Sequence, residues 1–174
     1  MRFTPLSLPG VVQVDIEPAE DPRGSFARVF CAEEFAAHGL PSAFAQHSIS
    51  FNHVAGTLRG LHYQRAPQEA KLIRCVRGAA YDVVVDLRPG SDHYARWCAL
   101  ELSAERHNAV FVPKGCAHGF QTLTDATELL YQIDVPFEAS VAAGVRWNDP
   151  TLAIPWPLAE PILSQRDRDL PWLE

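Results

Sequence analysis

The stretch AYDVVVDL, residues 80–87, carries the clearest fold signal in the chain. Val83 and Val85 alternate along it with Asp82 and Asp86. Alternation with a period of two is typical of a β-strand that has one apolar and one polar face. We therefore predict a half-buried strand whose aspartates lie on its polar side.

Short apolar runs of the same kind follow one another on both sides of this strand, separated by Gly, Pro and polar turn residues. They are TLRGLHY (57–63), KLIRCVR (71–77), RWCALEL (96–102), NAVFVP (108–113), GFQTL (119–123) and TELLYQID (127–134). Many short strands at this spacing are typical of a sandwich or a barrel. The predicted fold class is therefore all-β.

Helix signals are scarce. Residues 31–40, CAEEFAAHGL, combine good helix formers with a glycine that can end a helix. The segment from residue 147 onward is rich in Pro and contains three tryptophans. Free tails rarely carry so many tryptophans, so we expect an ordered segment packed over the sheet.

Composition fits a globular protein. The 174 residues, 47% apolar and 21% charged, predict one domain that spans residues 1–174. The formal net charge of −6 argues against a nucleic-acid partner, because phosphate backbones demand clustered Lys and Arg. A small anionic substrate would need only a few local cations.

The spacing of the cysteines and the sequence of the N-terminus bear on where in the cell the protein is expected. Cys31, Cys75, Cys98 and Cys116 form neither a CxxC pair nor a dense framework, and the first residues lack the apolar core of a signal peptide. No run approaches the ~20 apolar residues of a membrane-spanning helix. We expect a cytoplasmic protein with reduced thiols and no membrane partner.

Titratable side chains recur inside the predicted strands or directly beside them, namely His62, Lys71, His118 and Tyr131. Each alone could be a satisfied core residue, a strand end or a turn residue. Four such groups in one small barrel are costly to bury unless each has a partner. We therefore expect them to share a site.

Metal binding is one alternative for this site. PKGCAH, residues 113–118, resembles the second motif of cupins, small jelly-roll barrels that often hold a metal through an HxHxxxxE motif and this later histidine. A first motif that starts at His62 would place Gln64 at the second ligand position, and Glu69 is displaced. We expect no metal, with a metal-dependent cupin enzyme as the alternative.

Six motifs together resemble those of the dTDP-4-dehydrorhamnose 3,5-epimerase family. They are RGLHYQ, KLIRCVRGAAYDVVVDLRPGS, VPKGCAHGFQTL, ELLYQ, RWNDP and SQRD, and the resemblance runs from about residue 21 to residue 167. It implies a cupin jelly-roll barrel and an isomerase that needs neither a metal nor a redox cofactor. The implied substrate is a dTDP-linked 4-keto-6-deoxyhexose such as dTDP-4-keto-6-deoxyglucose, inverted at C3, C5 or both.

The resemblance also implies catalytic roles. The C4 ketone makes the adjacent C–H bonds acidic, so inversion through an enolate needs a base, an acid and a cation. His62 matches the base, and Asp167 matches the carboxylate that orients it. Tyr131 matches the acid on the other face, and Lys71 matches the cation near the C4 oxygen.

Further residues match the family's substrate-binding positions. They are Arg23, Arg59, His118 and Arg166 around the diphosphate and sugar, Arg28 and Phe137 at positions near the nucleotide base, and Gln46 and Ser48 in a motif upstream of His62. Three of these depart from the family: Arg28 replaces a glutamate, Ser48 an asparagine and Phe137 a stacking tyrosine. The departures leave open which carbons are inverted and which nucleotide base is preferred. A single-site epimerase is therefore an alternative.

Arg59 and His62 pose a geometric problem. A regular strand would place them on opposite faces, so both reach one pocket only if the strand bulges or bends, which Gly60 would permit. We predict an irregularity at Gly60.

The resemblance also implies a homodimer in which an N-terminal strand joins the partner's sheet, so that Arg23 and Arg28 enter the neighbouring pocket. A third functional alternative is a non-catalytic module that binds sugar nucleotides. The simultaneous presence of all four proposed catalytic residues, His62, Asp167, Tyr131 and Lys71, argues against it.

Overall fold

The structure, a computed structural model, describes residues 1–173. The strands are β1 (Arg2–Pro5), β2 (Val12–Asp15), β3 (Ala19–Asp21), β4 (Gly24–Phe26), β5 (Gln46–Asn52), β6 (Leu58–Gln64), β7 (Lys71–Arg77), β8 (Ala79–Asp86), β9 (Trp97–Ser103), β10 (Ala109–Val112), β11 (Cys116–Thr122), β12 (Thr127–Ile133) and β13 (Ala142–Gly144). The helices are α1 (Ala32–Ala37) and α2 (Gln165–Arg168).

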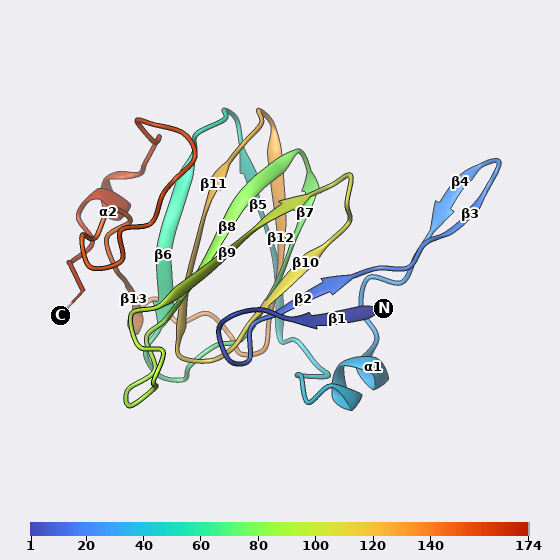
Figure 1. Cartoon of the computed structure of the whole chain (residues 1–174), viewed down its shortest axis with the longest axis horizontal. Helices are drawn as coiled ribbons and strands as arrows, with labels where there is room; N and C mark the ends of the chain where they lie inside the picture. The colour runs from blue at the N-terminus through green and yellow to red at the C-terminus, as the bar shows by residue number, and fades with distance from the viewer. Residues whose placement is uncertain (174) are drawn as a thin grey trace.

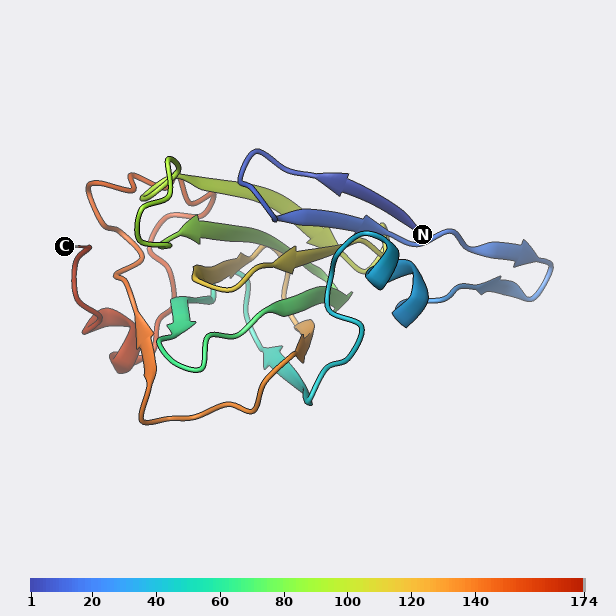
Figure 2. The ribbon, with the colours of Figure 1, turned by 90° about the horizontal axis from the view of Figure 1, so that it is seen from below.

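Two antiparallel sheets form the body of the molecule (Figures 1 and 2). One has the strand order β1-β2-β10-β7-β12-β5, and the other has the order β13-β6-β11-β8-β9. Apolar side chains from both sheets, such as Ile73, Leu129, Val84 and Phe120, pack together between them. This is the jelly-roll arrangement, and it confirms the all-β prediction.

Both sheets also bury their outer faces. The segment after β13 covers the five-stranded sheet, where Leu152 and Ile154 pack against Leu61 and Val83. On the six-stranded sheet, Phe35 of α1 joins a second outer cluster. The predicted helix and the predicted packing of the C-terminal segment are thus confirmed.

Strand β8 differs from the prediction. Asp82 and Asp86 are both 0% exposed, and Val83, Val84 and Val85 are buried as well. The predicted half-buried strand is wrong, because the interior covers one face of β8 and the C-terminal segment covers the other. The polar side of β8 faces the inside of the barrel.

The other predicted strands agree with the structure to within one residue at each end, except β11, which begins at Cys116 rather than at residue 119. This places His118 inside a strand. All four cysteines are free. Within residues 1–173, no helix has the length and apolar character needed to cross a membrane.

Strand β6 carries the predicted irregularity. Its register with β11 pairs His62 with His118 and Arg59 with Phe120, so Gly60 and Leu61 together oppose the single residue between those partners. Such a bulge changes which face the following side chains occupy. Because His118 and Phe120 point to the same side of β11, their partners His62 and Arg59 also share a side.

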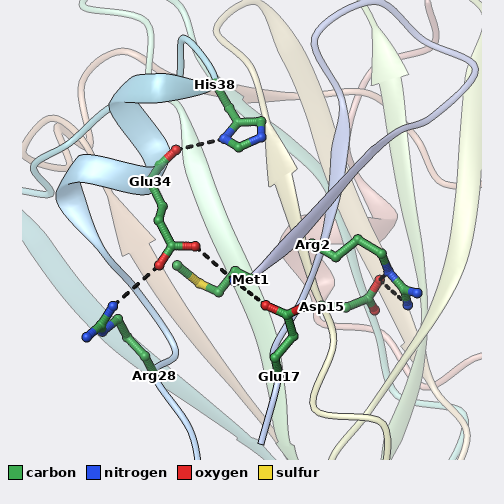
Figure 3. Close-up of polar contacts among 7 residues, drawn as sticks. All are labelled: Met1, Arg2, Asp15, Glu17, Arg28, Glu34 and His38. Carbon is green, nitrogen blue, oxygen red and sulfur yellow. Dashed lines mark hydrogen bonds and ion pairs between the residues drawn. The ribbon is translucent and has the colours of Figure 1, made fainter.

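The β3–β4 hairpin stands apart from both sheets and projects away from the barrel in both views (Figures 1 and 2). At its base, the N-terminal ammonium of Met1 lies 2.8 Å from Glu34 of α1 and 2.7 Å from Glu17 (Figure 3). Arg28 contacts the same Glu34 at 3.4 Å. These ion pairs tie α1 to the start of the hairpin.

Gly60 is the position where the bulge tolerates no side chain. Its φ is +135°, and a Cβ would lie 2.6 Å from the Cα of Gly119. We expect Gly60→Ala to lower the free energy of unfolding by roughly 2–5 kcal/mol, from backbone strain and overpacking together. Urea denaturation measures this change.

The matched control is Gly39→Ala. Gly39 also has a positive φ, +70°, but a Cβ there meets nothing within 4 Å. We expect a loss of about 1–2 kcal/mol from the backbone alone. Equal losses in the two variants would contradict the close approach of the two strands.

Candidate active site

His62 and Asp167 form the central pair of the site. The Nε2 atom of His62 lies 2.6 Å from Oδ1 of Asp167, although 105 residues separate them in sequence. The His62 side chain is 34% exposed and that of Asp167 only 5%. With Nε2 held by the carboxylate, Nδ1 of His62 has no hydrogen-bond partner within residues 1–173 and is free to take a proton.

Short helix α2 places Asp167 at this position. Ser164 caps the helix, and its hydroxyl accepts a hydrogen bond from the backbone N–H of Asp167 at 3.1 Å. The carboxylate also receives the backbone N–H of Gly60. The β6 bulge therefore both turns Arg59 inward and supplies a donor to the partner of His62.

These contacts stabilise the ionised form of Asp167. Burial alone raises the pKa of its carboxyl, but hydrogen bonds from His62, Gly60 and Ser164 and the charge of His62 outweigh it, so the pKa lies below its ordinary value. Asp167 is consequently ionised at neutral pH. An ionised carboxylate orients the imidazole and stabilises the cation that forms when His62 takes a proton.

Tyr131 of β12 lies on the opposite sheet, with its hydroxyl 3.4 Å from that of Ser50. Removal from water raises the pKa of the phenol well above its ordinary value, and the negative charge of Asp82 raises it further. The hydroxyl therefore keeps its proton at neutral pH. This is the state required of a proton donor.

Lys71 begins β7 on the same sheet. Its register partner is Ile133, two residues from Tyr131, and its side chain points to the same side as buried Ile73. The ammonium lies 2.8 Å from the carboxylate of Glu69, and these side chains are only 12% and 7% exposed. Lys71 is thus a fixed, largely dehydrated cation beside the interior.

His118 pairs with a second carboxylate. Its Nε2 atom lies 2.8 Å from Oδ2 of Asp82, and the two side chains are 5% and 0% exposed. The ring meets that of Tyr131 edge-on, with 6.2 Å between centroids. Asp82 was assigned to a polar strand face by its alternation, so the sequence missed its place in the site.

The remaining predicted residues lie around this cluster. Arg59 donates to Asn52 at 2.8 Å, and Gln46 accepts the backbone N–H of Phe137 at 2.6 Å. Ser48 is the cross-strand partner of Tyr131. Arg166 is exposed and directly precedes Asp167 on α2.

Arg23 and Arg28 do not join the cluster within one chain. Arg23 lies on the projecting hairpin, where it is 89% exposed and paired with Asp21 at 2.5 Å. Arg28 lies beside α1 with Glu34 (Figure 3). The structure therefore separates these two predicted residues from the other ten.

The side chains considered as metal ligands have other partners. His62 pairs with Asp167, His118 with Asp82, and Glu69 with Lys71. Among residues 1–173, no group of three or more His, Cys, Asp or Glu is arranged to hold a metal ion.

The lowered pKa of Asp167 makes its contribution to stability depend on pH. We expect Asp167→Asn to lower the free energy of unfolding by about 1.5–3 kcal/mol at pH 7, because hydrogen bonds to a buried charge are lost. Because the pKa of Asp167 is lower in the native state, its ionised carboxylate stabilises the native state at pH values above the unfolded pKa of about 3.9. This stabilisation is lost as pH falls through the native pKa. Urea melts at pH 7, 4 and 3 should show a nearly constant wild-type advantage down to about pH 4 and a clearly smaller one at pH 3. A difference that is constant with pH would contradict the assigned ionisation.

Comparisons with known proteins agree with this geometry. A sequence profile of the family described as dTDP-4-dehydrorhamnose 3,5-epimerase matches residues 5–174. The dTDP-4-dehydrorhamnose 3,5-epimerase of Methanothermobacter thermautotrophicus is 39% identical over 171 residues, which cover 97% of this chain and 92% of the relative. The dTDP-4-dehydrorhamnose 3-epimerase of Streptomyces niveus is 40% identical over 171 residues, covering 97% and 82%.

A solved structure is equally similar. The crystal structure of the dTDP-4-dehydrorhamnose 3,5-epimerase from Bacillus anthracis, with TDP and PPi bound, matches with a TM-score of 0.96 at 40% identity and covers 99% of both chains. Profile, relatives and structure all span nearly the full length. The chain belongs to the dTDP-4-dehydrorhamnose 3,5-epimerase family.

Proposed function

We propose that the protein is an isomerase that epimerises a dTDP-linked 4-keto-6-deoxyhexose, of the dTDP-4-dehydrorhamnose 3,5-epimerase type. The observation that carries this proposal is the 2.6 Å contact between His62 and Asp167 in a chain of this family. It provides an oriented base at the mouth of a barrel whose opposite sheet holds a protonated Tyr131.

The chemistry needs only the side chains described. Nδ1 of His62 removes the proton from a carbon next to the C4 ketone, and Asp167 stabilises the resulting imidazolium. The electron pair of the C–H bond becomes the enolate, whose oxygen is stabilised by the ammonium of Lys71. Tyr131 then returns a proton to the same carbon from the opposite face, which inverts its configuration.

Arginines supply the charge for the diphosphate. Arg59, turned inward by the bulge, and Arg166, exposed beside Asp167, offer forked donors that suit phosphate oxygens. Both lie next to the pair that carries the base. A local cationic region of this kind is compatible with the net charge of −6.

A single-site epimerase is the second candidate, and Phe137 favours it. The ring is 53% exposed beside Gln46 and lacks the hydroxyl of a tyrosine. One relative at 40% identity is a 3-epimerase. Measurement of exchange at both carbons distinguishes the two candidates.

The catalytic assignment predicts solvent exchange. In deuterium oxide with dTDP-4-keto-6-deoxyglucose, we expect the proton NMR signals at C3, C5 or both to disappear with time. Loss of both signals indicates a double epimerase, and loss of one indicates a single-site enzyme. His62→Ala should abolish exchange while calorimetry shows dTDP binding nearly unchanged, because the base acts on the sugar.

His93→Ala is the control, since His93 lies in the loop between β8 and β9. It should exchange at the wild-type rate. Equal loss of dTDP binding and exchange in His62→Ala would contradict the role of His62 as base.

We also propose a homodimer formed by the hairpin. Strand β5 ends its sheet and pairs only with β12, while β3 and β4 pair only with each other. Ile49 on β5 is 60% exposed, and Phe26 at the end of the hairpin is 82% exposed. An open edge that exposes Ile49 and an unpaired hairpin that exposes Phe26 are complementary, so the hairpin of one chain extends the partner's sheet at β5. The partner's Arg23 then completes the pocket.

Subunit mixing tests this arrangement. Arg23→Ala and His62→Ala should each be inactive alone, and a refolded mixture should recover exchange, because one pocket of each mixed dimer carries neither substitution. Sedimentation gives the oligomeric state of each sample. A mixture that stays inactive while dimeric would show that Arg23 serves its own chain.

A further inference from the structure

The interior contains two histidine–carboxylate pairs side by side. His62 and His118 are direct partners across β6 and β11, so their rings leave the same face of the sheet. Each binds its carboxylate through Nε2, at 2.6 Å to Asp167 and at 2.8 Å to Asp82. Within residues 1–173, each therefore has Nδ1 without a protein partner. The two rings are held in the same manner.

Asp82 is buried at a cost that packing does not explain. Its side chain is 0% exposed, and Oδ1 is the one buried side-chain nitrogen or oxygen in residues 1–173 that has no hydrogen bond. Burying a carboxylate without full pairing costs free energy. Burial raises the pKa of Asp82, against the opposing effect of His118 and Lys71. The native state would thus be more stable without this charge.

Asp86 on the same strand shows what a structural carboxylate looks like. It is equally buried, but Oδ1 accepts two hydrogen bonds from Arg88, and Oδ2 accepts one from Arg88 and one from Ser91. Its network fixes the loop after β8. Asp82 has only His118, and its other charged neighbour is Lys71.

We infer that Asp82 is a positioning residue of the reaction, which holds Nε2 of His118 and so presents Nδ1 of that ring to the bound sugar nucleotide. The inference rests on the proposed function and adds a residue to it. A carboxylate at one ring nitrogen fixes both the ring's orientation and the tautomer. Asp82 also acts on the proposed acid, because His118 packs edge-on against Tyr131 and the charge of Asp82 raises the pKa of that phenol.

Asp82→Asn separates this role from a structural one. The amide keeps the size of the side chain but removes the charge, and its NH₂ group can donate to Nε2. We expect kcat for epimerisation and for deuterium exchange to fall on the order of 10- to 100-fold, with dTDP affinity within about 3-fold of wild type. Unfolding in urea should show stability equal to or above that of the wild type.

Asp86→Asn is the matched control on the same strand. It should lower stability, because four hydrogen bonds are disturbed, and leave kcat per folded molecule unchanged. If Asp82→Asn instead loses stability with unchanged kcat, Asp82 is structural and the inference is overturned.

A measurement on the histidine rings keeps the test independent of the substrate. In protein labelled with ¹⁵N-histidine, the His118 ring signals, assigned by difference with His118→Gln, should report a changed tautomer in Asp82→Asn. Unchanged His118 signals would overturn the inference. Failure of the wild type to exchange protons with any 4-keto nucleotide sugar would overturn the proposed function, and the two failures can be told apart because the NMR signals need no substrate. Where deuterium exchange is measurable, the variant that combines Asp82→Asn with His118→Gln should exchange no more slowly than His118→Gln alone. Additive losses of exchange rate would show that Asp82 does not act through His118.

Discussion

The close approach of Gly60 to Gly119 is the constraint on which the site depends. Neither residue has a side chain, so β6 can bulge against β11. A Cβ added at Gly60 would lie only 2.6 Å from the Cα of Gly119. The bulge has two effects at once: it turns Arg59 to the side of His62, and it frees the Gly60 N–H for Asp167. A regular strand in this place would separate His62, Asp167 and Arg59. The catalytic geometry is therefore set by the backbone before any functional side chain is considered.

Three basic side chains inside the barrel follow a common pattern, in which each has its own carboxylate. Lys71 has Glu69, His62 has Asp167 and His118 has Asp82. The pairs differ in how completely they are shielded, from 34% exposure at His62 to 0% at Asp82. An acidic protein can therefore present positive charge to an anionic ligand, because Arg59 and Arg166 stay outside these pairs and remain available at the mouth.

Much of this arrangement can be predicted from the sequence, but for different reasons. Strand positions follow from period-two alternation, which reflects local geometry, and the irregularity at Gly60 follows from asking how Arg59 and His62 could share a side. Alternation does not reveal what covers a face, so Asp82 and Asp86 were wrongly expected on a half-buried strand. The pairing of His62 with Asp167 spans 105 residues and came from the family resemblance, since no local pattern encodes it. Arg23 and Arg28 lie apart from the cluster within one chain, where they pair with Asp21 and Glu34.

The unsatisfied oxygen of Asp82 has a consequence for the evolution and engineering of this protein. Most proteins can be stabilised by removing isolated defects, and a buried carboxylate with an unpaired oxygen is among the first that a stability screen would correct. Under the inferred role of Asp82, selection for soluble yield or heat resistance alone would favour neutral residues at position 82 and lower turnover without any loss of folding. Libraries built on this scaffold need an activity filter from the first round, and by the same inference a homologue with a neutral residue at this position would keep the barrel but turn over more slowly.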